Sequence, residues 1–255
     1  MNTECVYFFD GTFNGLLCCL FECYEKKEFP RDVFPLSEAQ ATLFRHKEIP
    51  TNPAKAVRVR RAIPRKLGAD AWDFIRKAFL TQLPDRFLRI LQFLRLGFAY
   101  GPRVMQMLTR EPVCTLYKAV RNLEMEAHHF LGFLRFSAYD GVLFAEIEPK
   151  NDILPLVTRH FCERFPEERF LIHDRTHETA LVYEPYRYTF QEASVIEPPE
   201  AGREELLWRS LWRLFHRTVE IRPRHNPQCQ QTHLPQRFRG LMTEFQPDEA
   251  SLLEA

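Results

Sequence analysis

The 255-residue chain is 45% hydrophobic and contains 23 Phe, which is enough to fill the core of one large domain or two small ones. Its net charge is only +1, and its nine Gly form neither a GxGxxG nor a GxxxxGK[ST] motif, which argues against a dinucleotide fingerprint and a P-loop. Seven cysteines, no secretion signal at the first residues and no apolar run of about 20 residues predict a cytoplasmic protein with reduced thiols and no membrane partner.

The first residues predict one β-α unit. The stretch CVYFFDG is apolar up to Asp10 and closes with Asp-Gly, as a short buried strand does. Thr12 can cap the helix that follows, in which Cys18, Cys19 and Cys23 lie among leucines at helical spacing. We therefore expect these cysteines to pack inside the protein rather than to hold an iron-sulfur cluster.

The rest of the first half is predicted to be helical. Asn52-Pro53 opens a basic helix that should end near Pro64. Apolar residues then recur at helical spacing between Pro and Gly boundaries. These patterns predict helices over 69–82, 84–100 and 112–129.

After Gly132 the helical pattern gives way to alternation. Two alternating runs flank Asp140-Gly141, which is the strongest hairpin signal in the chain. A capped helix and a second hairpin follow, so residues 130–184 predict a β-β-α-β-β unit with an antiparallel sheet. The stretch REELLWRSLWRLFHRTVEI then predicts an amphipathic helix. Its inward-facing residues should be Leu207, Trp208, Leu211, Trp212 and Phe215.

Together these elements predict an α+β fold: a helix-rich N-terminal half, an antiparallel β-β-α-β-β sheet unit, and a C-terminal amphipathic helix with a basic tail. The expected organisation is a core over 1–190 (helical over 1–129, sheet unit over 130–190), a linker over 191–202, the C-terminal helix and docking tail over 203–245, and a disordered end over 246–255.

Positive charge is concentrated in two segments. Residues 55–110 carry 13 Lys and Arg against three Asp, a net charge of +10, and residues 203–239 carry eight Arg against three Glu, a net charge of +5. Such asymmetry points to a polyanion such as DNA. The predicted nucleic-acid contacts are Arg58, Arg60, Arg61, Arg209, Arg213, Arg217, Arg224 and Arg237. Charge stripes are also typical of solvated helix faces, and Glu205 with Arg209 has the spacing of an ordinary helix pair.

The tail RHNPQCQQTHLPQRFRGLMTEF, residues 224–245, admits three hypotheses. His225, Cys229 and His233 are spaced by four, and a helix starting at Asn226 would put Cys229 and His233 one turn apart, a spacing compatible with two zinc ligands. A zinc site needs further ligands, and no CxxC or HxxxH pair stands nearby. A polar docking segment is therefore favoured over nucleic-acid contact, metal binding is the weakest of the three, and no cofactor is expected.

Asp10, His128 and His160 are the candidates for acid–base chemistry. Asp10 should stand at a strand end, and Glu124 lies one turn before His128 and could orient its ring. For both histidines, packing in the core is the favoured interpretation. Whether the protein is an enzyme therefore stays open.

Six stretches resemble, in the same order and over nearly the whole chain, a bacterial family of uncharacterised proteins assigned to DNA metabolism. They are FDGTFNGLLCCLFECYEKKEFP, FLRLGFAYG, EAHHFLGFLRF, HFCERFP, FLIHD and NPQCQQTHLPQRFRGLMTEF. The resemblance implies a DNA-repair context, because genes of that family commonly lie beside one for a radical SAM protein of DNA modification or repair. It also implies a link to uracil-DNA glycosylase, since the domain is sometimes fused to a uracil-DNA glycosylase-like domain. It supplies no catalytic residues.

Three hypotheses about function follow. The first is a DNA-associated accessory protein in DNA repair or modification, which binds DNA or presents it to the radical SAM partner. The second is a lyase or hydrolase that acts on a damaged or modified nucleobase through Asp10, His128 and His160. The third is a protein–protein adaptor whose Arg-rich face meets an acidic partner.

Overall fold

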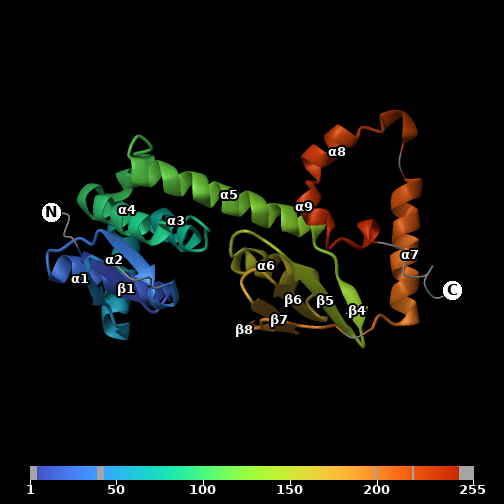
Figure 1. The fold of residues 1–255 in the computed structure, drawn as a ribbon, viewed down its shortest axis with the longest axis horizontal. Helices are drawn as coiled ribbons and strands as arrows, with labels where there is room; N and C mark the ends of the chain where they lie inside the picture. The colour runs from blue at the N-terminus through green and yellow to red at the C-terminus, as the bar shows by residue number, and fades with distance from the viewer. Residues whose placement is uncertain (1–4, 39–42, 199, 220, 247–255) are drawn as a thin grey trace. The chain divides into compact units, whose positions relative to one another are not determined.

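The computed structural model describes residues 5–38, 43–198, 200–219 and 221–246. The chain divides into two compact units, Met1–Glu124 and Met125–Ala255 (Figure 1). The change from helices to sheet that the sequence predicts after residue 129 lies in the second of these units. The predicted disordered end, apart from Gln246, lies outside the described residues. Within the described ranges, no helix has the length and apolar character needed to cross a membrane.

The first unit contains a small parallel sheet of three strands, β1 (Cys5–Phe9), β2 (Asp32–Pro35) and β3 (Arg45–Glu48). Their order is β2-β1-β3, with both outer strands parallel to β1. All five residues of β1 are buried, as its apolar sequence predicts. Strands β2 and β3 are not predicted from the sequence, because both have only four residues and β3, RHKE, has no apolar side chain to mark it.

Four α-helices are described in the first unit, and a fifth begins there and ends in the second unit. They are α1 (Phe13–Glu25), α2 (Pro53–Leu67), α3 (Ala69–Phe79), α4 (Arg86–Tyr100) and α5 (Glu111–Phe133). Helix α2 contacts α1, α3 and α4, and one apolar core runs from the strands through these helices to the first half of α5. The predicted cysteine packing is confirmed, since Cys18, Cys19 and Cys23 are all buried in α1.

Two predicted helix starts are confirmed at atomic detail. The Thr12 hydroxyl accepts a hydrogen bond from the Gly15 amide at 3.0 Å, and the Asn52 side chain accepts from the amides of Ala54 and Lys55, as N-caps do. The predicted end near Pro64 is wrong. Helix α2 continues to Leu67, because the Pro64 carbonyl still accepts from the amide of Gly68, whose φ of 97° then ends the helix.

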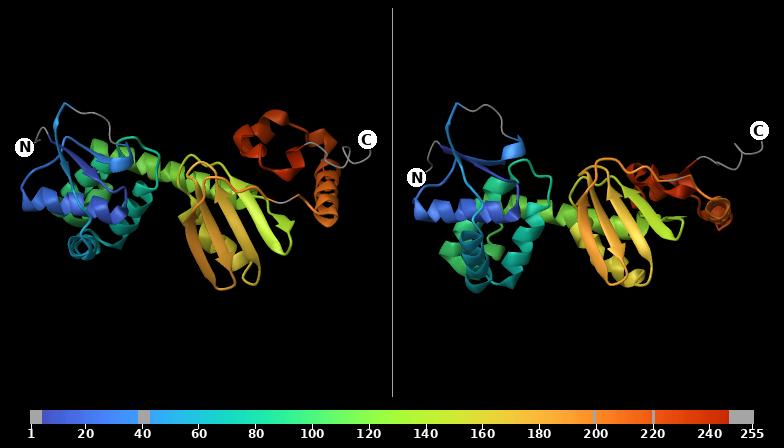
Figure 2. Two further views of the ribbon diagram at one scale, coloured as in Figure 1. Left: turned by 60° about the horizontal axis from the view of Figure 1, so that its bottom comes forward. Right: turned by 90° about the horizontal axis from the view of Figure 1, so that it is seen from below.

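The second unit is built on a five-stranded sheet. Its strands are β4 (Ser137–Tyr139), β5 (Val142–Ile147), β6 (Arg169–Asp174), β7 (Thr179–Glu184) and β8 (Arg187–Glu192). They lie side by side in chain order (Figure 2). The predicted α+β class, with a helix-rich first half and a sheet after it, is thus confirmed.

Two details of this sheet differ from the sequence prediction. Strands β5 and β6 pair in parallel, since α6 (Leu154–Arg164) carries the chain back across the sheet, so the sheet is mixed rather than wholly antiparallel. Strand β8 was missed. All six of its side chains are exposed, so no buried face imposes an alternating pattern on its sequence.

The last part of the second unit consists of helices. These are α7 (Arg203–Thr218), α8 (Pro227–His233) and α9 (Gln236–Arg239), and Figure 1 shows α8 and α9 leading the chain from α7 back to the end of α5. The inward apolar face predicted for α7 is wrong. The five residues predicted to face inward are all exposed, Trp208 at 61%, whereas the Arg213 side chain is buried, at 4%.

Candidate nucleic-acid interface

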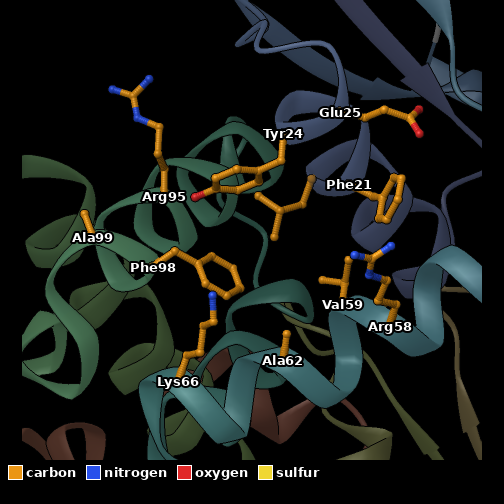
Figure 3. Close-up of a pocket in the computed structure, with 11 residues that line it drawn as sticks. Phe21, Tyr24, Glu25, Arg58, Val59, Ala62, Lys66, Arg95, Phe98 and Ala99 are labelled. Atoms are coloured by element: carbon orange, nitrogen blue, oxygen red, sulfur yellow. The ribbon is translucent and has the colours of Figure 1, made fainter.

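A pocket of about 700 Å³ opens in the first unit between α1, α2 and α4 (Figure 3). Its rings are Phe21 and Tyr24 from α1 and Phe98 from α4, and we call it the aromatic pocket. Tyr24 is 51% exposed although it is a large aromatic residue. Its ring meets Phe98 edge to face, with centroids 5.7 Å apart. The volume lies within the range of about 300–1,000 Å³ that is usual for ligand sites.

Three cations line the same pocket, Arg58 and Lys66 from α2 and Arg95 from α4. The Lys66 ammonium lies 5.4 Å from the centroid of Phe98, and the Arg58 guanidinium lies 5.6 Å from that of Phe21. In Figure 3 both side chains reach toward these rings. None of the three forms a salt bridge with a described carboxylate, so their charge stays available to an anion.

Helical spacing explains why these residues share one site. Arg58 and Lys66 are eight residues apart on α2, with Ala62 midway, and residues separated by four lie on one face of a helix. Ala62, with its small side chain, lies between the two cations in the lining. Glu25 is the acidic residue of the lining, and Lys55 binds its carboxylate at 3.1 Å. The pocket is therefore apolar in its floor and positive at its rim.

The arginines predicted in the first unit fall in different places. Arg58 lines the aromatic pocket, whereas Arg60 and Arg61 are exposed on α2 and are not part of the lining. On α4, Arg89 forms ion pairs with Asp85 and Glu111. The hydrogen bond that Arg89 donates to Asp85 holds the pKa of Arg89 above its usual value.

In the second unit, two of the predicted arginines are held inside the fold. Arg209 binds Glu205 at 2.9 Å, which confirms the expected helix pair, and also donates to the hydroxyls of Ser137 and Tyr139 at 3.0 Å. Arg213 is buried. Arg217 and Arg224 are exposed, so solvent anions can reach them.

The remaining predicted arginine, Arg237, docks the tail onto α5. Its guanidinium donates to Glu126 at 2.9 Å, and the next residue, Phe238, packs against the rings of Phe130 and Phe133. Glu126 is 3% exposed. This contact has the form of the docking segment that was favoured for the tail.

The three histidine and cysteine candidates for metal binding stay at the surface. Cys229 and His233 lie on α8, one turn apart, and Asn226 caps that helix as predicted. His225 precedes the helix, and all three residues are exposed. Among the residues that the structure describes, no three His, Cys, Asp or Glu side chains are grouped so that they could hold a metal ion.

The three acid–base candidates are not joined by any described hydrogen bond or ion pair. Asp10 lies in the first unit, and His128 and His160 lie exposed in the second, so the prediction that these histidines are packed in the core is wrong. Glu124 does not orient His128, because its carboxylate binds Lys77 at 2.9 Å.

Asp10 stands at the end of β1, in the loop that faces the start of α2. Its carboxylate accepts hydrogen bonds from the hydroxyls of Thr12 and Thr51 at 2.8 and 2.7 Å. Burial opposes ionisation, but these hydrogen bonds outweigh it and lower the pKa of Asp10. A carboxylate that stays ionised is a poor proton donor.

Two prominent features of the structure are not predicted from the sequence. Tyr24, Lys66 and Phe98 were not identified as a site, because they come from three different helices. Asp174 and His177 were missed as well, and their side chains are hydrogen-bonded at 2.7 Å. Burial would lower the pKa of His177, yet the hydrogen bond and charge of Asp174 raise it above its usual value.

The fold and the aromatic pocket define an α+β protein of two units with a positive, aromatic-lined site on the first. The chain belongs to the family described as a domain of unknown function, DUF4130, whose profile matches residues 84–244. The match begins just before α4 and includes the whole described second unit up to Glu244, whereas β1 to α3 precede it. No curated protein matches the chain.

Proposed function

We propose that this protein is a DNA-associated accessory factor in DNA repair or modification, and that it contacts DNA through the aromatic pocket. The observation that carries the proposal is the meeting of three cations, Arg58, Lys66 and Arg95, with the exposed ring of Tyr24 in one pocket. Cationic side chains bind phosphates, and aromatic faces stack on bases. The pocket thus offers contacts to both the phosphate and the base of a nucleotide.

The charge distribution supports the same proposal. The segment from residue 55 to 110, with its net charge of +10, contains α2 and α4, which supply the three cations of the pocket. The exposed Arg60 and Arg61 on α2 would extend the contact along a phosphate backbone. Arg217 and Arg224 offer a second positive surface on the second unit.

The resemblance to a DNA-metabolism family supplies the proposed context. A radical SAM protein is the proposed partner, and a uracil-DNA glycosylase-like protein is a further one. We do not propose the lyase or hydrolase, because no described observation favours it. A protein–protein adaptor is the outcome to be expected if no DNA binding is found.

The proposal predicts salt-dependent DNA binding by the protein alone. Fluorescence anisotropy with labelled oligonucleotides at several salt concentrations should give a Kd that rises steeply with salt. Lys66→Ala and Arg58→Ala should each weaken binding and reduce the slope of log K against log salt by about one. Each variant removes one phosphate contact.

Arg159→Ala is the matched control for these variants. Arg159 lies on α6 in the second unit, its side chain is 87% exposed, and its ion pair with Glu163 is an ordinary surface pair. The control removes the same charge and should bind like the native protein. Binding that does not respond to salt, or an equal loss in all three variants, would show that the aromatic pocket is not the DNA contact.

A further inference from the structure

We infer that the aromatic pocket accepts an unpaired base, so that the protein selects single-stranded DNA over duplex. This inference rests on the proposed function and names the form of DNA that the site takes. The geometry behind it is the Tyr24 ring, half exposed and standing edge to face against Phe98 at 5.7 Å between centroids.

Stacking is the first reason for the selection. In a duplex both faces of every base are covered by their neighbours, so the ring of Tyr24 can stack only on a base that has left the helix. The pocket has room for such a base, since its volume is about 700 Å³. Leu20, Val59 and Ala62 provide an apolar floor, which gains from the removal of a base from water.

The arrangement of charge is the second reason. Lys66 and Arg58 lie over the rings of Phe98 and Phe21. Arg95 points away from these two cations (Figure 3), with its guanidinium 4.4 Å from the centroid of Phe29. The cations thus flank the rings instead of filling the pocket. A strand whose base enters the pocket would have its neighbouring phosphates near these cations, whereas a rigid duplex cannot bring its phosphates to the rim and a base to the floor together.

A free nucleotide has the same chemistry as one unit of a strand, and the test must separate the two. The probes are a labelled thymidine oligomer, its duplex with the complementary strand, and thymidine monophosphate as competitor. The single strand should bind at least about tenfold more tightly than the duplex, and the monophosphate should compete weakly. Competition by the monophosphate at the concentration of the oligomer would overturn the inference in favour of a nucleotide site.

Variants of Tyr24 test the stacking directly. Tyr24→Ala should reduce single-strand affinity about tenfold and remove most of the preference over duplex, whereas Tyr24→Phe, which keeps the ring, should retain both. Tyr117→Ala is the control, because Tyr117 is similarly exposed, at 47%, on α5 and does not line the pocket. It should bind like the native protein.

The outcomes separate this inference from the proposed function. Salt-dependent binding that is equal for single strand and duplex, and that Tyr24→Ala leaves unchanged, overturns the inference while the proposed DNA contact stands. Absence of salt-dependent binding to every DNA probe removes both. Circular dichroism of each variant checks that a loss of affinity does not come from unfolding.

Discussion

Replacing Glu126 by Gln is expected to lower the free energy of unfolding of the second unit by about 2 kcal/mol, since it leaves buried hydrogen-bond donors without a charged acceptor. Glu126 accepts hydrogen bonds from the backbone amides of Lys150 and Asn151 and from Arg237, all at 2.9–3.0 Å. A Gln side chain turns one of these acceptors into a donor that faces donors.

The measurement is urea unfolding of the full chain, with hydrogen exchange of peptides from β5 to β7 as the signal of the second unit. Trypsin digestion should also cleave faster after Arg237 and Arg239, because the tail loses its anchor. Glu163→Gln is the control. Its carboxylate is 64% exposed in a surface pair with Arg159, so it should cost less than about 1 kcal/mol. Equal stability of the two variants would contradict the prediction.

The pKa of Glu126 makes the contribution of this contact to stability depend on pH. Burial raises the pKa, but the hydrogen bonds from Lys150 and Asn151 and the charge of Arg237 outweigh it and lower the pKa. A carboxyl with a lowered pKa stabilises the fold above its unfolded value of about 4.3 and loses this contribution as the pH falls through the folded value. In Glu126→Gln the decline in stability below pH 4.3 should therefore be shallower.

Other titratable groups of the second unit determine how its stability changes as the pH falls and as the pH rises. The pKa values of Glu205 and Glu244 are lowered as well, since hydrogen bonds to their carboxylates outweigh burial, the strongest from the Ala138 amide and from Arg135 respectively. The raised pKa of His177 acts in the opposite direction. Its contribution is complete below about pH 6.5 and is lost as the pH rises through the folded value. The second unit should therefore be most stable at weakly acidic pH.

Features with a local cause could be predicted from the sequence. The caps at Thr12 and Asn52, the hairpin at Asp140-Gly141 and the Glu205–Arg209 pair each depend on residues within one or two turns of each other. Asp140 and Gly141 have positive φ angles, which a tight hairpin requires and which Asp and Gly tolerate. Such signals are complete within a short window of sequence.

Features that depend on distant residues could not be predicted. Glu126 and Arg237 are 111 residues apart, and no periodicity relates them. The aromatic pocket combines α1, α2 and α4 in the same way. The orientation of α7 shows a further limit: its apolar stripe predicts an inward face, but Arg209 has better partners in Glu205, Ser137 and Tyr139, and a buried guanidinium must keep its hydrogen bonds.

Replacing Gly97 by Ala is expected to destabilise the first unit by about 1–3 kcal/mol, the cost of overpacking a core contact. Gly97 lies on α4 where it meets the end of α2. A Cβ atom there would stand 2.2 Å from Cδ2 and 2.8 Å from Cγ of Leu67, and Leu67 is only 1% exposed. Because Leu67 is buried, relief of this clash must displace its side chain or separate the two helices.

A shift at this contact should also change the shape of the aromatic pocket, because its lining residues Lys66 and Phe98 are the neighbours of Leu67 and Gly97 in the chain. DNA binding should therefore weaken severalfold in Gly97→Ala under conditions where the variant is still folded. Gly132→Ala on α5 is the matched control: a Cβ there meets nothing within 4 Å, and Ala stabilises an exposed helix by about 0.5–1 kcal/mol relative to Gly. Urea unfolding and anisotropy check both variants. If Gly97→Ala matched this control in stability and in affinity, the close approach of α2 and α4 would not be what shapes the pocket.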